Sequence, residues 1–446
     1  MRTAIYLILF IFISYSEILA QRSNKSAVEK LSKSVFEETT LTGLKFRSIG
    51  PAQTSGRVSD FAINPNNFKE YYVAAASGGV WKTVNAGTTY IPVFDEAGSY
   101  SIGCITMDPN NANVIWVGTG ENNNQRSVSY GDGVYKSIDG GETWKNMGLK
   151  SSEHIGKILV DPNNSNIIYV AAIGPLWSSG GERGVYKSVN GGETWRLMLG
   201  IDADTGINDL IMDPRDSQVI YAAAYQRRRH VFTYLGGGPS SGLHKSVDGG
   251  TTWVDINKGL PEVDMGRIGM AMAPSDPEVI YAIVEASEGK GGFFMSTNRG
   301  ASWKKQGNYS TSGNYYQEIV VDPQDAQTVY AMNTWIQVSR DGGKTFKVLG
   351  ETTKHVDNHC MWIDPTDSEH FLVGCDGGIY ESWDRAETWH YKPNLPVTQF
   401  YKVALDNAYP FYHVYGGTQD NASLGGPSRS LSDNGISNEE WINTHG

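Results

Sequence analysis

Cysteine is scarce in this chain, which has only Cys104, Cys360 and Cys375 among its 446 residues. An odd number this small excludes a framework of disulfide bonds. We predict that the three cysteines are buried free thiols. A bond between Cys360 and Cys375 is the alternative, if adjacent strands bring the two together.

Long apolar runs are missing after residue 20. Residues 1–20 have a charged start, an apolar stretch and a small-residue end before Gln21. They are too short for a membrane span and are typical of a cleaved signal peptide. Residues 21–41 are polar and read as a leader. The sequence therefore predicts an exported protein, in the periplasm, at the cell surface or outside the cell, without a transmembrane segment.

Basic residues are outnumbered, with 37 Lys and Arg against 48 Asp and Glu and a formal net charge of −11. The only local exception is R-R-R at residues 227–229. This balance excludes nucleic acid as an expected partner. The sequence shows no recognisable Ser-His-Asp arrangement, and the G-G-G-P at residues 236–239 lacks the setting of a phosphate-binding loop. No cofactor is expected.

A motif of eight residues recurs seven times: Ser or Thr, any residue, Asp or Asn, any residue, Gly, any residue, Thr or Ser, and an aromatic residue. A clear copy is S-I-D-G-G-E-T-W at residues 137–144, and the copies begin at residues 83, 137, 188, 246, 296, 339 and 382. Repeats of about 40 to 50 residues have the size of one four-stranded propeller blade. We therefore predict an all-β protein, a β-propeller.

Each position of the motif has a structural role. The Asp or Asn can accept hydrogen bonds from backbone N–H groups just downstream, and the Gly can adopt the positive φ of a tight turn. The aromatic residue can fill the gap between blades. We therefore expect the Asp residues of the motif to stabilise turns and not to catalyse.

The repeats set the expected organisation of the chain. Residues 42–398 form seven complete blades, and residues 399–446 begin a further blade that the end of the sequence truncates. We expect contacts with sequence beyond that end. Residues 44–51 resemble a fourth strand without its blade and are expected to form an outer strand.

In such blades the motif turns all lie on one face, and the irregular loops lie on the opposite, top face, where binding concentrates. An aromatic, amide-rich mouth there suits glycan or peptide ligands. The predicted ligand-binding residues are Arg57, Arg126, His154, Trp177, Arg228, Tyr316, Glu318, Asp357, His359, Gln399 and Asp420.

Catalytic residues cannot be assigned from the pattern alone. Glycoside hydrolysis needs two carboxyl groups about 5 to 10 Å apart, and the candidates retained here are Asp376, Glu318 and Asp357. The H-V-D-N-H at residues 355–359 has alternating metal-ligand types, but it lacks a fourth ligand, so no metal is predicted.

The motif resembles the Asp box of BNR-type β-propellers, and three groups of these are similar. Sialidases share only an F-R-S-I-G-P stretch at residues 46–51. Two-propeller xyloglucanases carry a catalytic Asp in D-x-G-G-x-Y, where this chain has Ser77 in its first repeat and the matching D-G-G-I-Y only at residues 376–380. Sortilin-type receptor propellers, and secreted bacterial sortilin-like proteins labelled glycosyl hydrolases, are the most similar.

These resemblances give two hypotheses. The favoured one is an exported, sortilin-like recognition scaffold that binds glycan or peptide on its top face. The alternative is a glycoside hydrolase that acts on polysaccharide with a top-face carboxylate pair. The sequence leaves open whether the protein is an enzyme.

Overall fold

The computed structural model describes residues 46–53, 55–125 and 128–445, and nearly all of its regular structure is β-strand. The predicted signal peptide and leader, at residues 1–20 and 21–41, lie outside these residues. No helix in the described part of the chain is long and apolar enough to span a membrane. Residues 50–446 form one compact unit.

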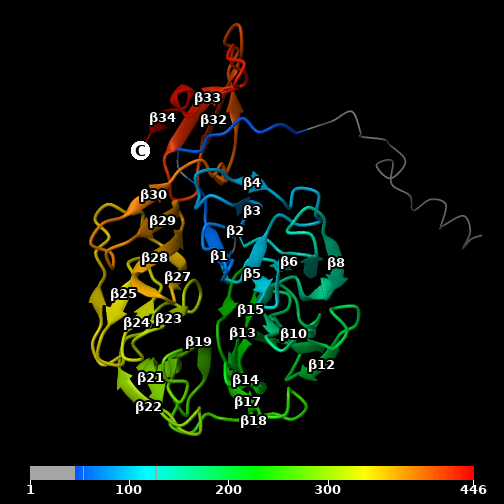
Figure 1. Cartoon of the computed structure of the whole chain (residues 1–446), viewed down its shortest axis with the longest axis vertical. Coiled ribbons are helices and arrows are strands. Elements are labelled where there is room, and N and C mark those ends of the chain that lie inside the picture. Colours follow the sequence, from blue (N-terminus) through cyan, green and yellow to red (C-terminus); the bar gives the residue numbers. More distant parts are fainter. Residues whose placement is uncertain (1–45, 54, 126–127, 446) are drawn as a thin grey trace, which may run out of the picture. The chain divides into compact units, whose positions relative to one another are not determined.

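Eight four-stranded antiparallel sheets account for this unit (Figure 1). The strands of sheets 1 to 3 are β1 (Val58–Ile63), β2 (Tyr71–Ala75), β3 (Gly79–Thr83), β4 (Ile91–Pro92), β5 (Ile102–Asp108), β6 (Asn111–Thr119), β7 (Val134–Ser137), β8 (Lys145–Gly148), β9 (Ile155–Asp161), β10 (Asn164–Ala172), β11 (Gly184–Ser188) and β12 (Arg196–Leu199). Those of sheets 4 and 5 are β13 (Thr205–Asp213), β14 (Asp216–Gln226), β17 (Gly242–Ser246), β18 (Val254–Asp255), β19 (Met265–Met272), β20 (Ile280–Ala286), β21 (Gly292–Ser296) and β22 (Lys304–Gly307).

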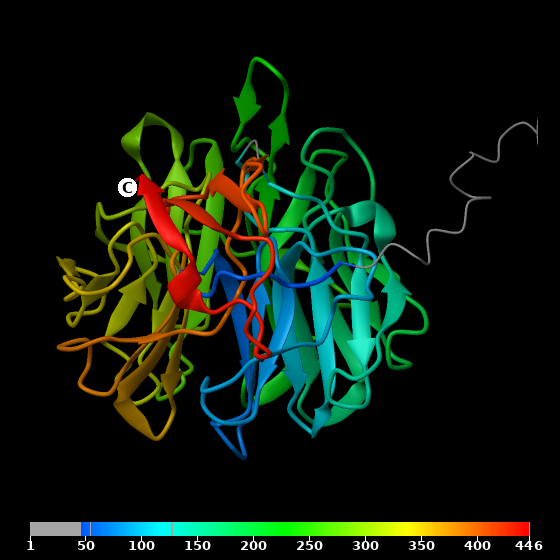
Figure 2. The same ribbon diagram turned by 90° about the horizontal axis from the view of Figure 1, so that it is seen from above.

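The strands of sheets 6 to 8 are β23 (Ile319–Val321), β24 (Val329–Ala331), β25 (Gln337–Ser339), β26 (Lys347–Val348), β27 (Asn358–Asp364), β28 (Asp367–Cys375), β29 (Gly378–Ser382), β30 (His390–Lys392), β31 (Ala404–Leu405), β32 (His413–Gly417), β33 (Ser423–Pro427) and β34 (Ile442–His445). A separate two-stranded hairpin, β15 (Arg228–Arg229) with β16 (Tyr234–Leu235), extends from sheet 4 (Figure 2). Three short 3₁₀ helices, η1 (Lys150–Ser152), η2 (Ser287–Gly289) and η3 (Asn438–Glu440), lie in connections.

The first seven sheets close into a ring. The buried apolar residues of the described chain form seven clusters, one at each junction between neighbouring sheets. One cluster joins Val58 and Tyr71 of sheet 1 to Leu372 and Ile379 of sheet 7, and this contact completes the circle. The prediction of a β-propeller is confirmed.

All seven copies of the motif join the third strand of a sheet to the fourth. Asp139 accepts a hydrogen bond from the Thr143 backbone N–H at 2.9 Å, and the Ser137 hydroxyl accepts one from the Gly141 N–H at 2.8 Å. Gly141 has a φ of 92°. Trp195 donates its indole N–H to the Met147 carbonyl of the preceding sheet at 2.7 Å. The motif therefore closes a turn and fastens one sheet to the next.

The last copy of the motif departs from the pattern, because Ala386 occupies the Gly position with a φ of 73°. Its backbone N–H still donates to the Ser382 hydroxyl at 2.8 Å. The three cysteines are free and buried, as predicted.

Two expectations about the chain ends need revision. Residues 46–51, the described part of the expected outer strand, contain no strand, because every sheet already obtains four strands from later residues. Residues 404–445 form a complete four-stranded eighth sheet, whereas the sequence suggested only its first two strands. Its third and fourth strands carry no copy of the motif and so gave no signal. The domain boundaries at residues 42, 398 and 446 remain predictions.

Candidate functional site on the top face

The first strands of the sheets share a local irregularity that shapes the centre of the ring. In β1, β5, β9, β13 and β27 the pairing register shifts by one residue near the start of the strand. Such a bulge turns an unpaired residue away from its normal face. The residues skipped in this way are Ser59, Gly103, Gly156, Asn208 and His359.

His359 is thereby directed at Asp376, the residue that directly follows β28. The imidazole Nε2 lies 2.8 Å from Asp376 Oδ1. Arg57 donates to both oxygens of the same carboxylate, from Nε at 2.7 Å and from Nη2 at 2.9 Å, and its Nη1 donates to Glu121 at 2.5 Å. All four side chains are buried, and Asp376 is completely inaccessible.

The neighbours of Asp376 in this network stabilise its negative charge. Burial alone raises the pKa of Asp376, but the charges and hydrogen bonds of His359 and Arg57 outweigh it and hold the pKa well below its usual value. Burial opposes the charge of Arg57 too, yet Glu121 and Asp376 raise its pKa. Asp376 is consequently an ionised anchor whose oxygens are both engaged.

Two adjacent tyrosines cover the network. The Arg57 guanidinium lies 4.6 Å from the centre of the Tyr315 ring. Tyr316 stacks on His359, with ring centres 5.6 Å apart and planes 18° apart, and its hydroxyl donates to Asp357. These contacts fix both aromatic rings and orient Asp357, which directly precedes β27.

An open pocket of about 480 Å³ lies over these rings. Its lining comes from the ring and from the eighth sheet: Gln125, Ser312, Tyr315, Tyr316, Asp357, Tyr401, Gln419 and Asp420. Tyr401 is 61% exposed and its hydroxyl donates to Gln419, whose amide donates to Asp420 at 2.6 Å. The pocket thus combines aromatic faces, amides and carboxylates.

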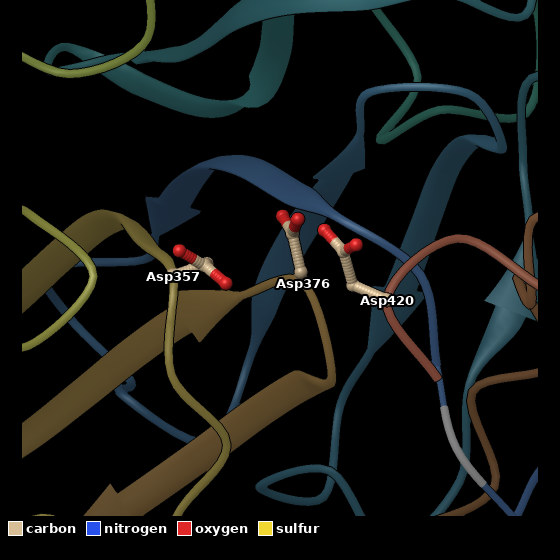
Figure 3. A group of neighbouring side chains, drawn as sticks. All are labelled: Asp357, Asp376 and Asp420. Carbon is tan, nitrogen blue, oxygen red and sulfur yellow. The ribbon is translucent and has the colours of Figure 1, made fainter. Parts of the chain in front are cut away.

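Three carboxylates converge beside the pocket (Figure 3). One oxygen from each of Asp357, Asp376 and Asp420 lies within 4.8 Å of the others. Burial and a hydrogen bond shared with Asp376 raise the pKa of Asp420. Both oxygens of Asp376 already contact Arg57 or His359, and a metal ion here would compete with these contacts. The H-V-D-N-H residues do not converge on a metal either, since His355 contacts the carbonyls of Val356 and Asp420.

The turn that carries Asp420 is held against the ring. Asn421 donates to the carbonyls of Ser55 at 3.3 Å and Asp376 at 3.2 Å, and His355 Nε2 lies 3.1 Å from the Asp420 carbonyl. Both nitrogens of His355 face carbonyl oxygens, which only accept. A hydrogen bond with Cys375, followed by these carbonyls, outweighs burial and raises the pKa of His355 to about 9.

The structure brings together six of the predicted site residues and separates the others. Arg57, Tyr316, Asp357, His359, Asp376 and Asp420 form one site, and Gln399 is linked to it because its carbonyl accepts from the Gln419 backbone at 2.9 Å. His154 is buried lower down against the Glu121 carbonyl at 2.8 Å, and burial lowers its pKa to about 3. Arg126 lies outside the described residues.

Glu318 does not line the open pocket. It faces Arg267 at 3.4 Å and lines a smaller cavity with Arg57, Tyr315 and His359, beside the site. Burial raises its pKa. Trp177, 44% exposed, and Arg228 lie on the loops of sheets 3 and 4 and do not line the pocket. Arg228 donates to Ser179 and faces Asp204 at 3.3 Å.

Sequence reasoning missed the role of the two arginines that flank Arg228. Arg227 and Arg229 are buried and donate to Asn123, Asn124 and Gly174, so they tie together the top loops of sheets 2, 3 and 4. Burial lowers the pKa of Arg227 to about 9. Alternation in the extended R-R-R stretch at residues 227–229, which turns 227 and 229 inward and 228 outward, was the available signal.

The central channel also holds charges that the sequence did not flag. Lys157, Asp60 and Asp209 line a cavity of about 130 Å³ beneath the site. Asp60 accepts from the Ile105 N–H and Asp209 from the Met270 N–H, each at 3.0 Å and each in the next sheet of the ring. These carboxylates therefore join neighbouring first strands.

Comparison with known proteins finds similarity in sequence to xyloglucanases and in fold to β-propeller enzymes. No family model matches the chain. A xyloglucanase from Hypocrea jecorina is 26% identical over 326 residues, which are 66% of this chain and 35% of the relative. The xyloglucanase Xgh74A from Acetivibrio thermocellus is 24% identical over 319 residues, 63% of this chain and 36% of the relative.

A solved structure of a GH74 xyloglucanase from Xanthomonas campestris superposes with a TM-score of 0.60 at 16% identity, and covers 83% of this chain and 59% of that one. At this identity the likeness shows the fold alone. The chain spans about a third of the length of the curated relatives that it matches. These findings favour the glycoside hydrolase alternative over the sortilin-like recognition scaffold.

Proposed function

We propose that this chain is the glycan-binding propeller of a xyloglucanase-like glycoside hydrolase, and that the polysaccharide lies in the top-face pocket. The observation that best supports this proposal is the pocket of about 480 Å³, which is lined by three tyrosines, two glutamines and two carboxylates. Aromatic faces stack on the apolar faces of sugar rings, and amides and carboxylates bind hydroxyls. The xyloglucanase relatives support this class of ligand.

The roles within the site follow from how each carboxylate is engaged. Asp376 is a positioning residue, because it is inaccessible and both its oxygens are taken. Asp420 is exposed and has a raised pKa, which suits a group that gives a proton to a glycosidic oxygen. Asp357 lines the same pocket and accepts a hydrogen bond from the Tyr316 hydroxyl. We therefore move the catalytic proposal from Asp376 to Asp420, with Asp357 as its partner.

Oligosaccharide binding and hydrolysis test this function separately. Purified protein is titrated with xyloglucan and mixed-linkage glucan oligosaccharides, and reducing ends are measured over hours. We expect binding that Tyr401→Ala weakens and turnover that Asp420→Asn abolishes without loss of binding. Absence of binding to every glycan tested, charged or neutral, would refute the proposal. Binding without turnover would keep the glycan site and remove the catalytic pair.

We also propose that the protein is exported from the cell. It rests on residues 1–20, whose composition is typical of a signal peptide. The N-terminal sequence of the protein recovered from the culture supernatant or periplasm tests it, and a start near Gln21 is expected.

A further inference from the structure

The charged side chains among the described lining residues of the top-face pocket are all negative. Among its described lining residues two are carboxylates, Asp357 and Asp420, and none is Lys, Arg or His. Two cations lie nearby. Arg57 is paired with Asp376 and Glu121 and contacts the Tyr315 ring. His355, whose pKa is raised to about 9, lies with its Nε2 3.1 Å from the Asp420 carbonyl. A ligand in this pocket therefore meets two carboxylates and, among the described lining residues, no cationic side chain.

The aromatic residues of the pocket suit the same kind of ligand. Tyr315, Tyr316 and Tyr401 all line it, and the negative faces of aromatic rings attract cations. Tyr401 is more than half exposed, so its ring is available for contact. An organic cation can bind between such rings and a carboxylate without displacing the existing hydrogen bonds of Asp376.

The crowding of the carboxylates adds a further reason. Oxygens of Asp357, Asp376 and Asp420 lie within 4.8 Å of one another. Burial, a hydrogen bond with Asp376 and repulsion by Asp376 and Asp357 raise the pKa of Asp420. A bound cation relieves this repulsion. A metal ion would compete with the contacts that Asp376 already makes, whereas an ammonium group needs only two or three acceptors.

We infer that the pocket selects amine-bearing glycans, such as β-1,4-linked glucosamine chains, over neutral and acidic ones. This inference rests on the glycan-binding function proposed above and adds a charge class to it. The ammonium group would lie between Asp420 and Asp357, with a sugar face against Tyr401. An acidic sugar would place like charges together and bind weakly.

Calorimetric titration at pH 6 and low salt tests the selection, with four tetrasaccharides: glucosamine, N-acetylglucosamine, cellotetraose and galacturonate. The glucosamine and N-acetylglucosamine tetramers form the decisive pair, because acetylation removes the charge. We expect the glucosamine tetramer to bind about 10-fold more tightly than the acetylated one. That preference should shrink as the NaCl concentration rises.

Variants locate the effect. Asp420→Asn should lose most of the preference for glucosamine, and its affinity for the glucosamine tetramer should fall by a larger factor than its affinity for cellotetraose. Asp95→Asn, an exposed carboxylate away from the pocket lining, removes the same net charge and should retain the preference. Asp420 is exposed, so its substitution should leave the melting temperature unaltered.

The outcomes separate this inference from the function on which it rests. Equal binding of glucosamine and acetylated tetramers, or tighter binding of galacturonate, overturns the amine preference and leaves glycan binding intact. Failure of all four tetrasaccharides to bind removes the glycan function itself. A tetralysine peptide that binds more tightly than the glucosamine tetramer would show that the pocket takes peptide amines instead.

Discussion

Replacing Arg57 by Met should destabilise the protein strongly, because two buried carboxylates would lose their cation. Asp376 is inaccessible and Glu121 is 5% exposed. Arg57 makes two hydrogen bonds to Asp376 and one to Glu121. Breaking a buried pair while leaving the partner charge in place costs about 3–5 kcal/mol. We therefore expect the free energy of unfolding at pH 7 to fall by that amount.

The pH dependence gives this prediction its signature. The folded-state pKa of Asp376 is depressed, so its contribution to stability is present above the unfolded pKa of about 3.9 and is lost as pH falls through the folded value. Arg57 is one of the groups that lower the pKa of Asp376 against the effect of burial. Without Arg57 this pKa rises, and Asp376 accepts a proton more readily. The stability deficit of Arg57→Met should therefore narrow as the pH is lowered toward 4.

Urea unfolding followed by tryptophan fluorescence at pH 7 and pH 4 measures both effects. Arg215→Met is the control, because Arg215 also contacts two carboxylates, Asp213 and Glu278, but its side chain is 43% exposed. Asp213 is buried, yet it would keep its salt bridge to Arg299 at 2.7 Å. That variant should lose less than about 1 kcal/mol. Equal losses in the two variants, or a deficit in Arg57→Met that is the same at both pH values, would refute the reasoning.

Three further predictions concern stability, and thermal unfolding measures each of them. Trp195→Ala removes a motif indole that is fastened to the preceding sheet and should cost about 3 kcal/mol, whereas Trp177→Ala, at an exposed position, should leave the melting temperature nearly unchanged. Asp139→Asn should be tolerated, because Asn190 makes the same turn contacts in another copy, and Asp139→Ala should lower the melting temperature. His355 has a raised pKa of about 9, so its stabilising effect should be complete below about pH 6.5 and disappear as the pH rises through 9; His355→Ala should abolish that step.

The fold could be predicted from the sequence because each repeat carries its own local signal. The Ser, Asp and Gly of the motif act within five residues of one another, as the bonds of Asp139 and Ser137 show. Seven copies with one physical role leave little freedom in how the strands pair. The eighth sheet lacks the motif, and there the sequence indicated only two strands of four.

The site was only partly predictable, because its geometry depends on contacts between residues hundreds of positions apart. Arg57 and Asp376 are separated by 319 positions. The sequence placed both at the top face, since each lies near the top end of a strand, but it could not show that they bind each other. It therefore offered Asp376 as a catalytic candidate, and the structure shows a saturated, inaccessible carboxylate instead.

The residues that line the pocket come from two parts of the chain. Tyr315, Tyr316 and Asp357 belong to the ring, where the stacked His359 and the Arg57 network hold them rigidly. Tyr401 and Asp420 belong to residues that lead into and through the eighth sheet, and a few bonds from Asn421 and His355 fix them to the ring. Because Asn421 fixes the turn that carries Asp420, we expect Asn421→Ala to alter the affinity for glycans without disturbing the ring.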